Sequence, residues 1–455
     1  MGGFRFATQF GLNLPSCCHS EHVSAMSQTR ATPTSRCTLA WFGTQGILAF
    51  ATYTNGADYM LMFVPPSMTL LALVLLQVLV LVALSAVMSL GDALPILPRL
   101  IFATAAVMLA VGGTLALPAL ESQSAASALL CVCCSVMGLG NGVLQATSAG
   151  LAGAGGPALL TAQASGVGIA NLLMSVLRVA FKLALPGRVI ISYTWFAVAH
   201  MVVSILIVVL YVVAARRDPH LVSVLKQRRE AAAAAAAKKA DAKTADIPAA
   251  VSEGEVQVEV VGAAKGVVAA KGVVAAAKDE SMWETIRATG HYGLGQVFAL
   301  MTALTVFPGF ALQQESTLGL TEGWLPVLAI STFNVADCSM RVALMAFPII
   351  AKPSGLKHAC VFTSNLTAAI LVVVSCVLKW PDIVVLLFHV MLAISSSWQI
   401  NLCFVGADSF AAARNAPAAV RERTGALMQG MILIGVMCGL AFSTIIATVR
   451  ESAAA

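Results

Sequence analysis

Long apolar runs separated by short polar gaps make up most of the chain. A helix needs about 20 residues to cross the hydrocarbon core of a bilayer, and each run is close to that length or longer. The runs cover residues 39–57, 62–90, 98–119, 127–152, 157–185, 189–215, 292–313, 323–350, 358–380, 383–408 and 424–449. This pattern predicts about eleven transmembrane helices, six before a long polar gap and five after it. We therefore expect an all-α polytopic membrane protein.

The long polar gap divides the chain into two membrane-embedded parts. It contains a run of alanines and a repeated Ala-Lys-Gly-Val-Val-Ala-Ala, which are low-complexity features typical of a solvated linker. The predicted organisation is a cytosolic N-terminal tail (1–38), a six-helix part (39–215), a cytosolic linker (216–291), a five-helix part (292–449) and an extracellular C-terminal tail (450–455).

Composition agrees with this membrane assignment. Of the 455 residues, 59% are hydrophobic and only 11% are charged, whereas soluble chains carry roughly 25% charged residues. The cysteines lack the paired Cys or His spacing of a zinc site, so we expect no metal and no cofactor. An intramembrane enzyme would need a nucleophile with its base, or paired acids, at membrane depth, and we find no such cluster. The expected partners are a small-molecule substrate and the lipid bilayer, with no nucleic acid.

The positions of lysine and arginine predict the orientation of the chain. With the N-terminus in the cytosol, the tail, the linker and the other cytosolic loops hold most of the basic residues, as the positive-inside rule requires. We therefore expect a cytosolic N-terminus and an extracellular C-terminus, in the plasma membrane. The acid-poor, arginine-bearing tail leaves an organellar transit peptide as an alternative. We expect the protein to be a monomer.

Two opposite charges lie inside the run 323–350. Asp337 and Arg341 are four residues apart and therefore share one helix face, to which Asn334 adds an amide. A charge near the bilayer centre costs about 2.5–3.5 kcal/mol, so this face must look into a bundle interior or a wet cavity. The pair is either an internal salt bridge that holds helices together or the polar part of a ligand site at the membrane midplane.

Amide and basic side chains occupy two of the earlier runs. Asn141 and Gln145 are four residues apart in the fourth run, and they either bond neighbouring helices or, in the case of Gln145, offer a donor and an acceptor to a heterocycle. In the fifth run Arg178 is followed four residues later by a second basic residue. Because like charges at this spacing repel, we expect either an acidic side chain or a ligand oxygen as a partner, and Asp58 and Glu315 are the acidic candidates.

Three further residues inside the runs have both a structural and a functional interpretation. His200 and His389 are expected to be packed and hydrogen-bonded, with proton coupling as the alternative. Pro308 should loosen the seventh helix, either as a simple kink or as a gating bend.

Several of these residues belong to an ordered set of motifs. The motifs are Gly140-Asn141-Gly142-Val143-Leu144-Gln145 with Gly150-Leu151-Ala152-Gly153, then Gly166-Val167-Gly168 with Ser175-Val176-Leu177-Arg178, then Val306-Phe307-Pro308-Gly309, and last Phe333-Asn334-x-x-Asp337-x-x-x-Arg341. Together with the six-plus-five layout and the long central loop, this set resembles the equilibrative nucleoside transporter family over most of residues 39–449, and its protozoan members in particular.

The resemblance implies a helical bundle of the major-facilitator type that lacks its last helix and works by rocker-switch alternating access. It also implies that Asp337 and Arg341 engage the ribose of the substrate and that Gln145 contacts the base. The chemistry of these residues agrees with that assignment, because vicinal hydroxyls suit a carboxylate acceptor beside a guanidinium donor.

The chain departs from the pattern of this family in two places. The first helix of the family usually carries Leu-Pro-Trp-Asn, whose Trp stacks on the substrate, whereas this chain has Phe50 and Tyr53 in the corresponding stretch. Either of them is a candidate replacement. The tenth run has Trp398-Gln399-Ile400-Asn401 where the family often has Gly-Tyr. The choice between nucleosides and nucleobases therefore stays open.

We predict a facilitative transmembrane transporter of nucleosides, with purine nucleosides favoured, that works by alternating access and is not an enzyme. A nucleobase carrier, or a proton-coupled carrier of either substrate, is the alternative. The predicted substrate-binding residues are Asp337, Arg341, Gln145, Asn334, Arg178 and Asn141.

Overall fold

The computed structural model describes residues 33–90, 95–155, 157–218, 282–307, 316–320, 324–413 and 418–454, together with residues 222, 226 and 230. The predicted tail up to residue 32, most of the predicted linker, Glu315 and the Pro308-Gly309 pair lie outside this part of the chain. Each apolar run falls wholly or mostly within it.

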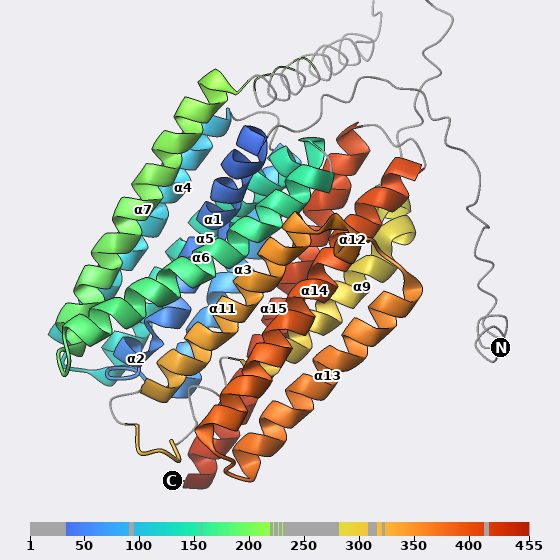
Figure 1. The fold of residues 1–455 in the computed structure, drawn as a ribbon. Helices are drawn as coiled ribbons and strands as arrows, with labels where there is room; N and C mark the ends of the chain where they lie inside the picture. Colours follow the sequence, from blue (N-terminus) through green and yellow to red (C-terminus); the bar gives the residue numbers. More distant parts are fainter. Residues whose placement is uncertain are drawn as a thin grey trace, which may run out of the picture. The chain divides into compact units, whose positions relative to one another are not determined.

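Eleven long α-helices form the described part of the chain, and they correspond one to one with the eleven apolar runs (Figure 1). They are α1 (Pro33–Asn55), α3 (Pro66–Leu90), α4 (Ile96–Thr114), α5 (Gln123–Gly155), α6 (Pro157–Ala184), α7 (Val189–Arg217), α9 (Met282–Val306), α11 (Trp324–Ala346), α13 (Gly355–Val377), α14 (Asp382–Ala413) and α15 (Ala418–Ala454). The short helices α2 (Ala57–Met60), η2 (Leu117–Ala119) and α12 (Pro348–Ala351) lie in the connections. The predicted all-α fold is confirmed, and the described residues contain no strand.

Two of the long helices are less apolar than a membrane-crossing segment usually is. Nine helices of the described part are long and apolar enough to cross a membrane, and α1 and α9 are not among them. The polar side chains of Gln45 and Thr52 in α1 and of Gln296 in α9 are buried inside the bundle. A helix that is surrounded by other helices can carry such groups, because they contact neighbouring helices and are not exposed to lipid.

Both of these helices also begin before their apolar runs. Helix α1 starts at Pro33 and α9 at Met282, several residues ahead of the predicted positions 39 and 292. Their first two turns carry exposed basic residues, Arg36 in α1 and Arg287 in α9. Helix ends outside the hydrocarbon tolerate such charges, so hydropathy alone underestimates the length of the helix.

Glycines allow α1 and α6 to approach each other closely. A Cβ atom added at Gly166 of α6 would collide with the backbone of Ala40, and one added at Gly43 of α1 would collide with the backbone of Gln163. Small residues at a helix contact let two backbones come together in a membrane, where apolar burial does not drive helix association. The α1–α6 contact therefore depends on these two glycines.

The first six long helices meet the last five along α6–α11 and where α15 packs on α3 and α5. A ladder of hydrogen bonds crosses the α6–α11 contact: Ser175 Oγ donates to Asn55 Oδ1 at 2.7 Å, and Asn334 Nδ2 donates to Ser175 Oγ at 2.8 Å. Polar residues of α1, α6 and α11 are thereby brought to one place inside the bundle.

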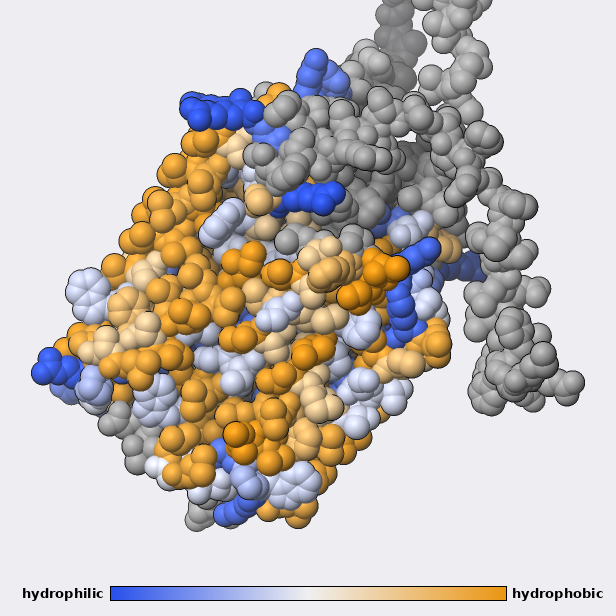
Figure 2. All heavy atoms as spheres, viewed as in Figure 1, coloured by the Kyte–Doolittle hydropathy of each residue, from blue (hydrophilic) through white to orange (hydrophobic). Residues whose placement is uncertain are grey.

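Apolar side chains cover the outside of the helices. Figure 2 shows them over most of the visible helix surface, while strongly hydrophilic residues lie mainly towards the helix ends. Large apolar residues such as Phe102, Leu109 and Ile445 are exposed, with relative exposures of 73%, 74% and 59%. A surface of this kind suits lipid rather than water, whereas the polar groups within the spans are mostly buried.

Candidate functional site

A cavity of about 110 Å³ lies between the two groups of helices. Its walls come from α1, α3, α5 and α6 on one side and from α9, α11, α14 and α15 on the other. At roughly 10–15 Å³ for each water-sized probe position, this space is several water molecules in size. Many of the side chains that line it are charged or carry amides, which is unusual for a space deep inside a membrane bundle.

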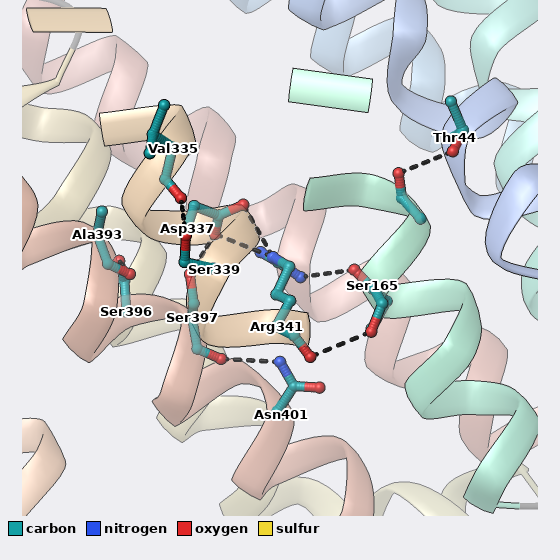
Figure 3. A network of polar contacts seen from close by, with 12 residues as sticks. Thr44, Ser165, Val335, Asp337, Ser339, Arg341, Ala393, Ser396, Ser397 and Asn401 are labelled. Carbon is teal, nitrogen blue, oxygen red and sulfur yellow. Dashed lines mark hydrogen bonds and ion pairs between the residues drawn. The ribbon is translucent and has the colours of Figure 1, made fainter. Parts of the chain in front are cut away.

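The charged part of the cavity wall is the Asp337–Arg341 pair of α11 (Figure 3). Arg341 Nε lies 2.9 Å from each carboxylate oxygen of Asp337 and donates to that carboxylate. Asp337 also accepts a hydrogen bond from Ser397 of α14, and Arg341 Nη1 donates to the carbonyl oxygen of Ala164 in α6 at 3.2 Å. Only 4% of Asp337 and 7% of Arg341 is exposed. Both charges are therefore balanced by each other and by neutral groups of two further helices.

Helix α6 fits closely against this pair. Ser165 Oγ donates to the carbonyl oxygen of Arg341 at 3.2 Å. A Cβ atom added at Gly168 would lie 2.8 Å from Arg341 Cδ and 2.9 Å from Cys338 Cα. The absence of a side chain at Gly168 therefore leaves room for the arginine.

Asp337 and Arg341 keep hydrogen-bonding capacity for a ligand. A guanidinium has five N–H donors, and the contacts to Asp337 and Ala164 use two of them. A carboxylate has about four acceptor positions, and Arg341 and Ser397 together occupy some of these. Because both side chains line the cavity, the pair can accept from and donate to neighbouring hydroxyl groups of a polyol.

Amides from three helices form a second polar part of the wall. Gln429 Nε2 of α15 donates to Gln145 Oε1 of α5 at 2.8 Å. Gln145 Nε2 and Gln77 Oε1 of α3 are buried and have no hydrogen-bond partner among the described residues. All three glutamines line the cavity. An unpaired buried amide is costly, so these atoms favour a polar ligand beside them.

Aromatic rings line the cavity between these polar parts. Phe307 and Phe333 are stacked, with ring centroids 4.1 Å apart and an angle of 6° between the planes. Of the two first-helix candidates, Phe50 lines the cavity. Tyr53 is fully buried, and its hydroxyl donates to the carbonyl oxygen of Thr69 at 3.0 Å. Phe50 is therefore the aromatic of α1 that can contact a planar ligand.

The structure brings four of the six predicted site residues to this cavity: Asp337, Arg341, Asn334 and Gln145. Asn141 lies one helical turn from Gln145 but is fully buried outside the lining, and neither polar atom of its side chain has a partner in the described part of the chain. Arg178 is also fully buried and lies outside the lining.

Arg178 belongs to an ion-pair cluster at the end of α6. Its Nε and Nη2 donate to the two carboxylate oxygens of Asp58 at 3.1 and 2.6 Å, and its Nη1 donates to Ser192 Oγ at 2.9 Å. Lys182 Nζ also reaches Asp58, at 2.8 Å. The prediction of an acidic partner for the two basic residues is confirmed for Asp58, while the other candidate, Glu315, lies outside the described residues.

Both intramembrane histidines are packed and hydrogen-bonded, as expected. His200 Nδ1 lies 2.6 Å from Thr52 Oγ1, and His389 Nδ1 lies 2.9 Å from the carbonyl oxygen of Val385. Both side chains are fully buried. Within the described residues, no group of three or more metal-binding side chains is present.

Several polar residues of the wall were not singled out from the sequence. Gln77, Gln163, Asn171 and Gln429 line the cavity, and Ser397 bonds Asp337. Each of the four amides is an isolated polar residue within or beside an apolar run. That isolation is the signal that marks them, because a lone amide in hydrocarbon needs an internal partner.

The fold is similar to that of solved transporters of the major facilitator superfamily. A D-xylose–proton symporter has a TM-score of 0.58 and 12% identity, over 90% of this chain and 89% of the other. The xylose transporter XylE from E. coli, in a partially occluded inward-open conformation, has a TM-score of 0.54 and 8% identity, over 92% and 96%. A peptide transporter in complex with alafosfalin has a TM-score of 0.52 and 13% identity, over 93% and 91%. At these identities the likeness concerns the fold alone.

The sequence itself matches a family model. The chain matches no curated protein. Residues 131–448, which are more than half of the chain, match the model described as "Nucleoside transporter". This segment includes Gln145, Asn334, Asp337, Arg341 and Gln429 of the cavity wall. The match and the fold identify a multi-pass membrane transporter of nucleosides rather than an enzyme. The chain belongs to the nucleoside transporter family.

Proposed function

We propose that this protein is a facilitative transporter that prefers purine nucleosides and works by alternating access. The observation that carries the proposal is the buried Asp337–Arg341 pair, which lines a cavity that also carries unpaired amide atoms. The family supports nucleosides as the substrate class. The likeness to major-facilitator folds supports a cycle in which the two groups of helices open the cavity to one side and then to the other.

In the proposed complex, Asp337 and Arg341 hold the ribose. The carboxylate accepts from the vicinal hydroxyls and the guanidinium donates to their oxygens, so both charges remain hydrogen-bonded inside the membrane. Asn334, one turn before Asp337 on the same helix, adds an amide to this sugar site. Gln145 faces the base, and Phe50 with the Phe307–Phe333 stack contacts its planar faces.

Arg178 and Asn141 have a supporting role in this proposal. Arg178 bonds Asp58 and Ser192 near the C-terminal end of α6. The same helix contacts Arg341 further towards its N-terminus, through the carbonyl oxygen of Ala164. Asn141 lies one turn from Gln145 within α5. Both act on the substrate through helices that also carry cavity residues, rather than by direct contact.

The proposal is tested by Asp337→Asn, which keeps the size of the side chain and removes its charge. In transport-deficient cells that express the protein, we expect uptake of labelled inosine and adenosine to fall at least tenfold. Ser339→Ala is the matched control, because the Ser339 hydroxyl is exposed and, among the described residues, donates only to the Val335 carbonyl of its own helix. We expect this variant to transport normally.

A second measurement separates loss of binding from loss of folding. Inosine should raise the melting temperature of the purified wild type. In Asp337→Asn the melting temperature without ligand should fall, because the buried Arg341 loses its charged partner. The variant should still unfold cooperatively, and inosine should no longer raise its melting temperature. Nucleoside uptake by Asp337→Asn equal to that of the control would disprove the ribose assignment. Uptake of labelled hypoxanthine alone, lost when the pH gradient is dissipated, would instead establish the proton-coupled nucleobase carrier.

A further inference from the structure

The hydrogen bond between Gln145 and Gln429 determines which side of the Gln145 amide is free. Gln429 Nε2 donates to Gln145 Oε1 at 2.8 Å, and 6% of Gln429 and 2% of Gln145 is exposed. The two residues come from α15 and α5, which lie on different sides of the long linker in the sequence. Because the oxygen of Gln145 is held by Gln429, its amide cannot turn without losing this bond.

The nitrogen of Gln145 is therefore the group that seeks a partner. Gln145 Nε2 is buried and donates to no partner among the described residues, although it carries two N–H groups. Gln145 lines the cavity. Leaving a donor unpaired in a low-dielectric interior is unfavourable, and a ligand with an acceptor at this position would remove that penalty.

Gln77 supplies the opposite group on the same wall. Its Oε1 is buried without a partner in the described part of the chain, and the residue is 1% exposed. Gln77 is on α3, which packs directly on α5: a Cβ atom at Gly138 would meet the carbonyl oxygen of Leu76. The cavity thus has a free donor on α5 and a free acceptor on α3.

We propose that Gln429 is a positioning residue which makes this cavity selective for nucleosides of 6-oxopurines. The proposal rests on the nucleoside transport proposed above and names the substrate class within it. The carbonyl oxygen at C6 of hypoxanthine accepts from Gln145 Nε2, and the neighbouring N1–H donates to Gln77 Oε1. Gln429 acts through Gln145, whose amide it holds in the orientation that faces the carbonyl.

The same arrangement disfavours adenosine. Adenine has an amino group at C6 and an unprotonated N1, which reverses the donor and the acceptor of hypoxanthine. The amino group then faces the N–H groups of Gln145, and the acceptor of Gln77 loses its donor. One buried hydrogen-bonding group left unpaired corresponds to a preference of roughly tenfold.

The variant Gln429→Glu tests the proposal, because a carboxylate can only accept hydrogen bonds. Gln145 would turn to donate its N–H groups to the introduced carboxylate and would present Oε1 to the cavity. We expect the ratio of inosine uptake to adenosine uptake, each as Vmax/KM, to fall from roughly ten to below one. Gln429→Leu frees the Gln145 amide to rotate, so its ratio should approach one.

Gln163→Glu is the matched control for the added charge. Gln163 also lines the cavity, but it is not bonded to Gln145 in the structure. This variant should keep the wild-type ratio. Purine riboside, which has neither an oxygen nor an amino group at C6, serves as the reference substrate. Dividing inosine and adenosine uptake by purine riboside uptake in each variant removes any general loss of transport.

The outcomes separate this proposal from the proposed function. The same inosine-to-adenosine uptake ratio in wild type, Gln429→Glu and Gln429→Leu would overturn the role of Gln429, even if all rates fell together. A purely structural role would lower the uptake of both nucleosides by the same factor. Wild-type preference for adenosine would overturn the 6-oxopurine assignment. Failure of the wild type to take up any nucleoside would instead overturn the proposed function.

Discussion

Asp337 and Arg341 illustrate what a single residue must satisfy inside this bundle. Each isolated charge would cost about 2.5–3.5 kcal/mol near the bilayer centre. The four-residue spacing predicts the pair, and the structure confirms it at 2.9 Å. The neutral partners Ser397 and Ala164 are 60 and 177 residues away in sequence, and no charge or spacing indicates them. Local ion pairs were therefore predictable from the chain, whereas the neutral groups that complete their solvation were not.

The two aromatic candidates of α1 differ in their surroundings, and their substitution should separate them. Phe50 lines the cavity, so Phe50→Ala should raise the KM for nucleosides several-fold through the loss of about 0.5–1.5 kcal/mol of aromatic contact. Tyr53→Phe removes only the hydroxyl that donates to Thr69. We expect it to lower the free energy of unfolding by roughly 0.5–1.5 kcal/mol and to leave the KM unchanged.

Uptake kinetics and thermal unfolding of the purified variants measure both effects. An increased KM in Tyr53→Phe with an unchanged KM in Phe50→Ala would mean that Tyr53, and not Phe50, contacts the substrate. Hydropathy could not have distinguished the residues, because both are aromatic and three positions apart on one helix.

At the scale of whole helices, hydropathy predicted the number and order of the elements better than their ends. All eleven runs became long helices, because a long apolar segment in a bilayer can satisfy its backbone groups only within a helix. The ends of α1 and α9 were missed because their first turns are polar. The pairing of α6 with both α1 and α11 was also not predictable, since it depends on glycines whose partners lie far away in the sequence.

Gly168 provides a test of the α6–α11 contact. The added methyl group of Gly168→Ala would lie 2.9 Å from Cys338 Cα and 2.8 Å from Arg341 Cδ, which is too close without movement of α11 or of the arginine. We expect a loss of about 1–3 kcal/mol in stability from this overpacking, together with reduced nucleoside uptake because Arg341 is displaced.

Gly290→Ala is the matched control for this substitution. Gly290 also lies within a helix, α9, and an added Cβ atom would meet no atom of the described residues within 4 Å. Its melting temperature should stay equal to that of the wild type or rise, since alanine is the better helix former. Equal uptake and equal melting temperatures in both variants would show that the α6–α11 contact can accommodate a methyl group at position 168 and is not closely packed there.

At the scale of the whole molecule, the two groups of helices are joined at places that a transport cycle would have to open. Ser67 N, at the start of α3, donates to Glu451 Oε1, near the end of α15, at 3.0 Å. Lys182 Nζ of α6 lies 5.2 Å from the centre of the Trp324 ring of α11. Both are polar contacts at helix ends rather than parts of an apolar core. Such contacts are weaker than core packing and can break and re-form in each cycle.

Alternating access predicts that a covalent link between α3 and α15 stops transport. The background replaces Cys17 and Cys18 of the N-terminal tail and the exposed Cys37 and Cys360 by serine. In it, the pair Ser67→Cys and Glu451→Cys should be joined by a short bifunctional thiol reagent. Nucleoside uptake should then fall in proportion to the fraction linked and should return after reduction.

The control link joins two helices of the same group. Ser35 of α1 donates to Asp218 at the end of α7 at 3.0 Å, so the pair Ser35→Cys and Asp218→Cys should link as readily. Because α1 and α7 would move together in a rocker-switch cycle, this link should leave uptake unchanged. Full transport with α3 and α15 completely linked would rule out a cycle that opens this contact. Inhibition by both links would mean that the first six helices do not move as one body.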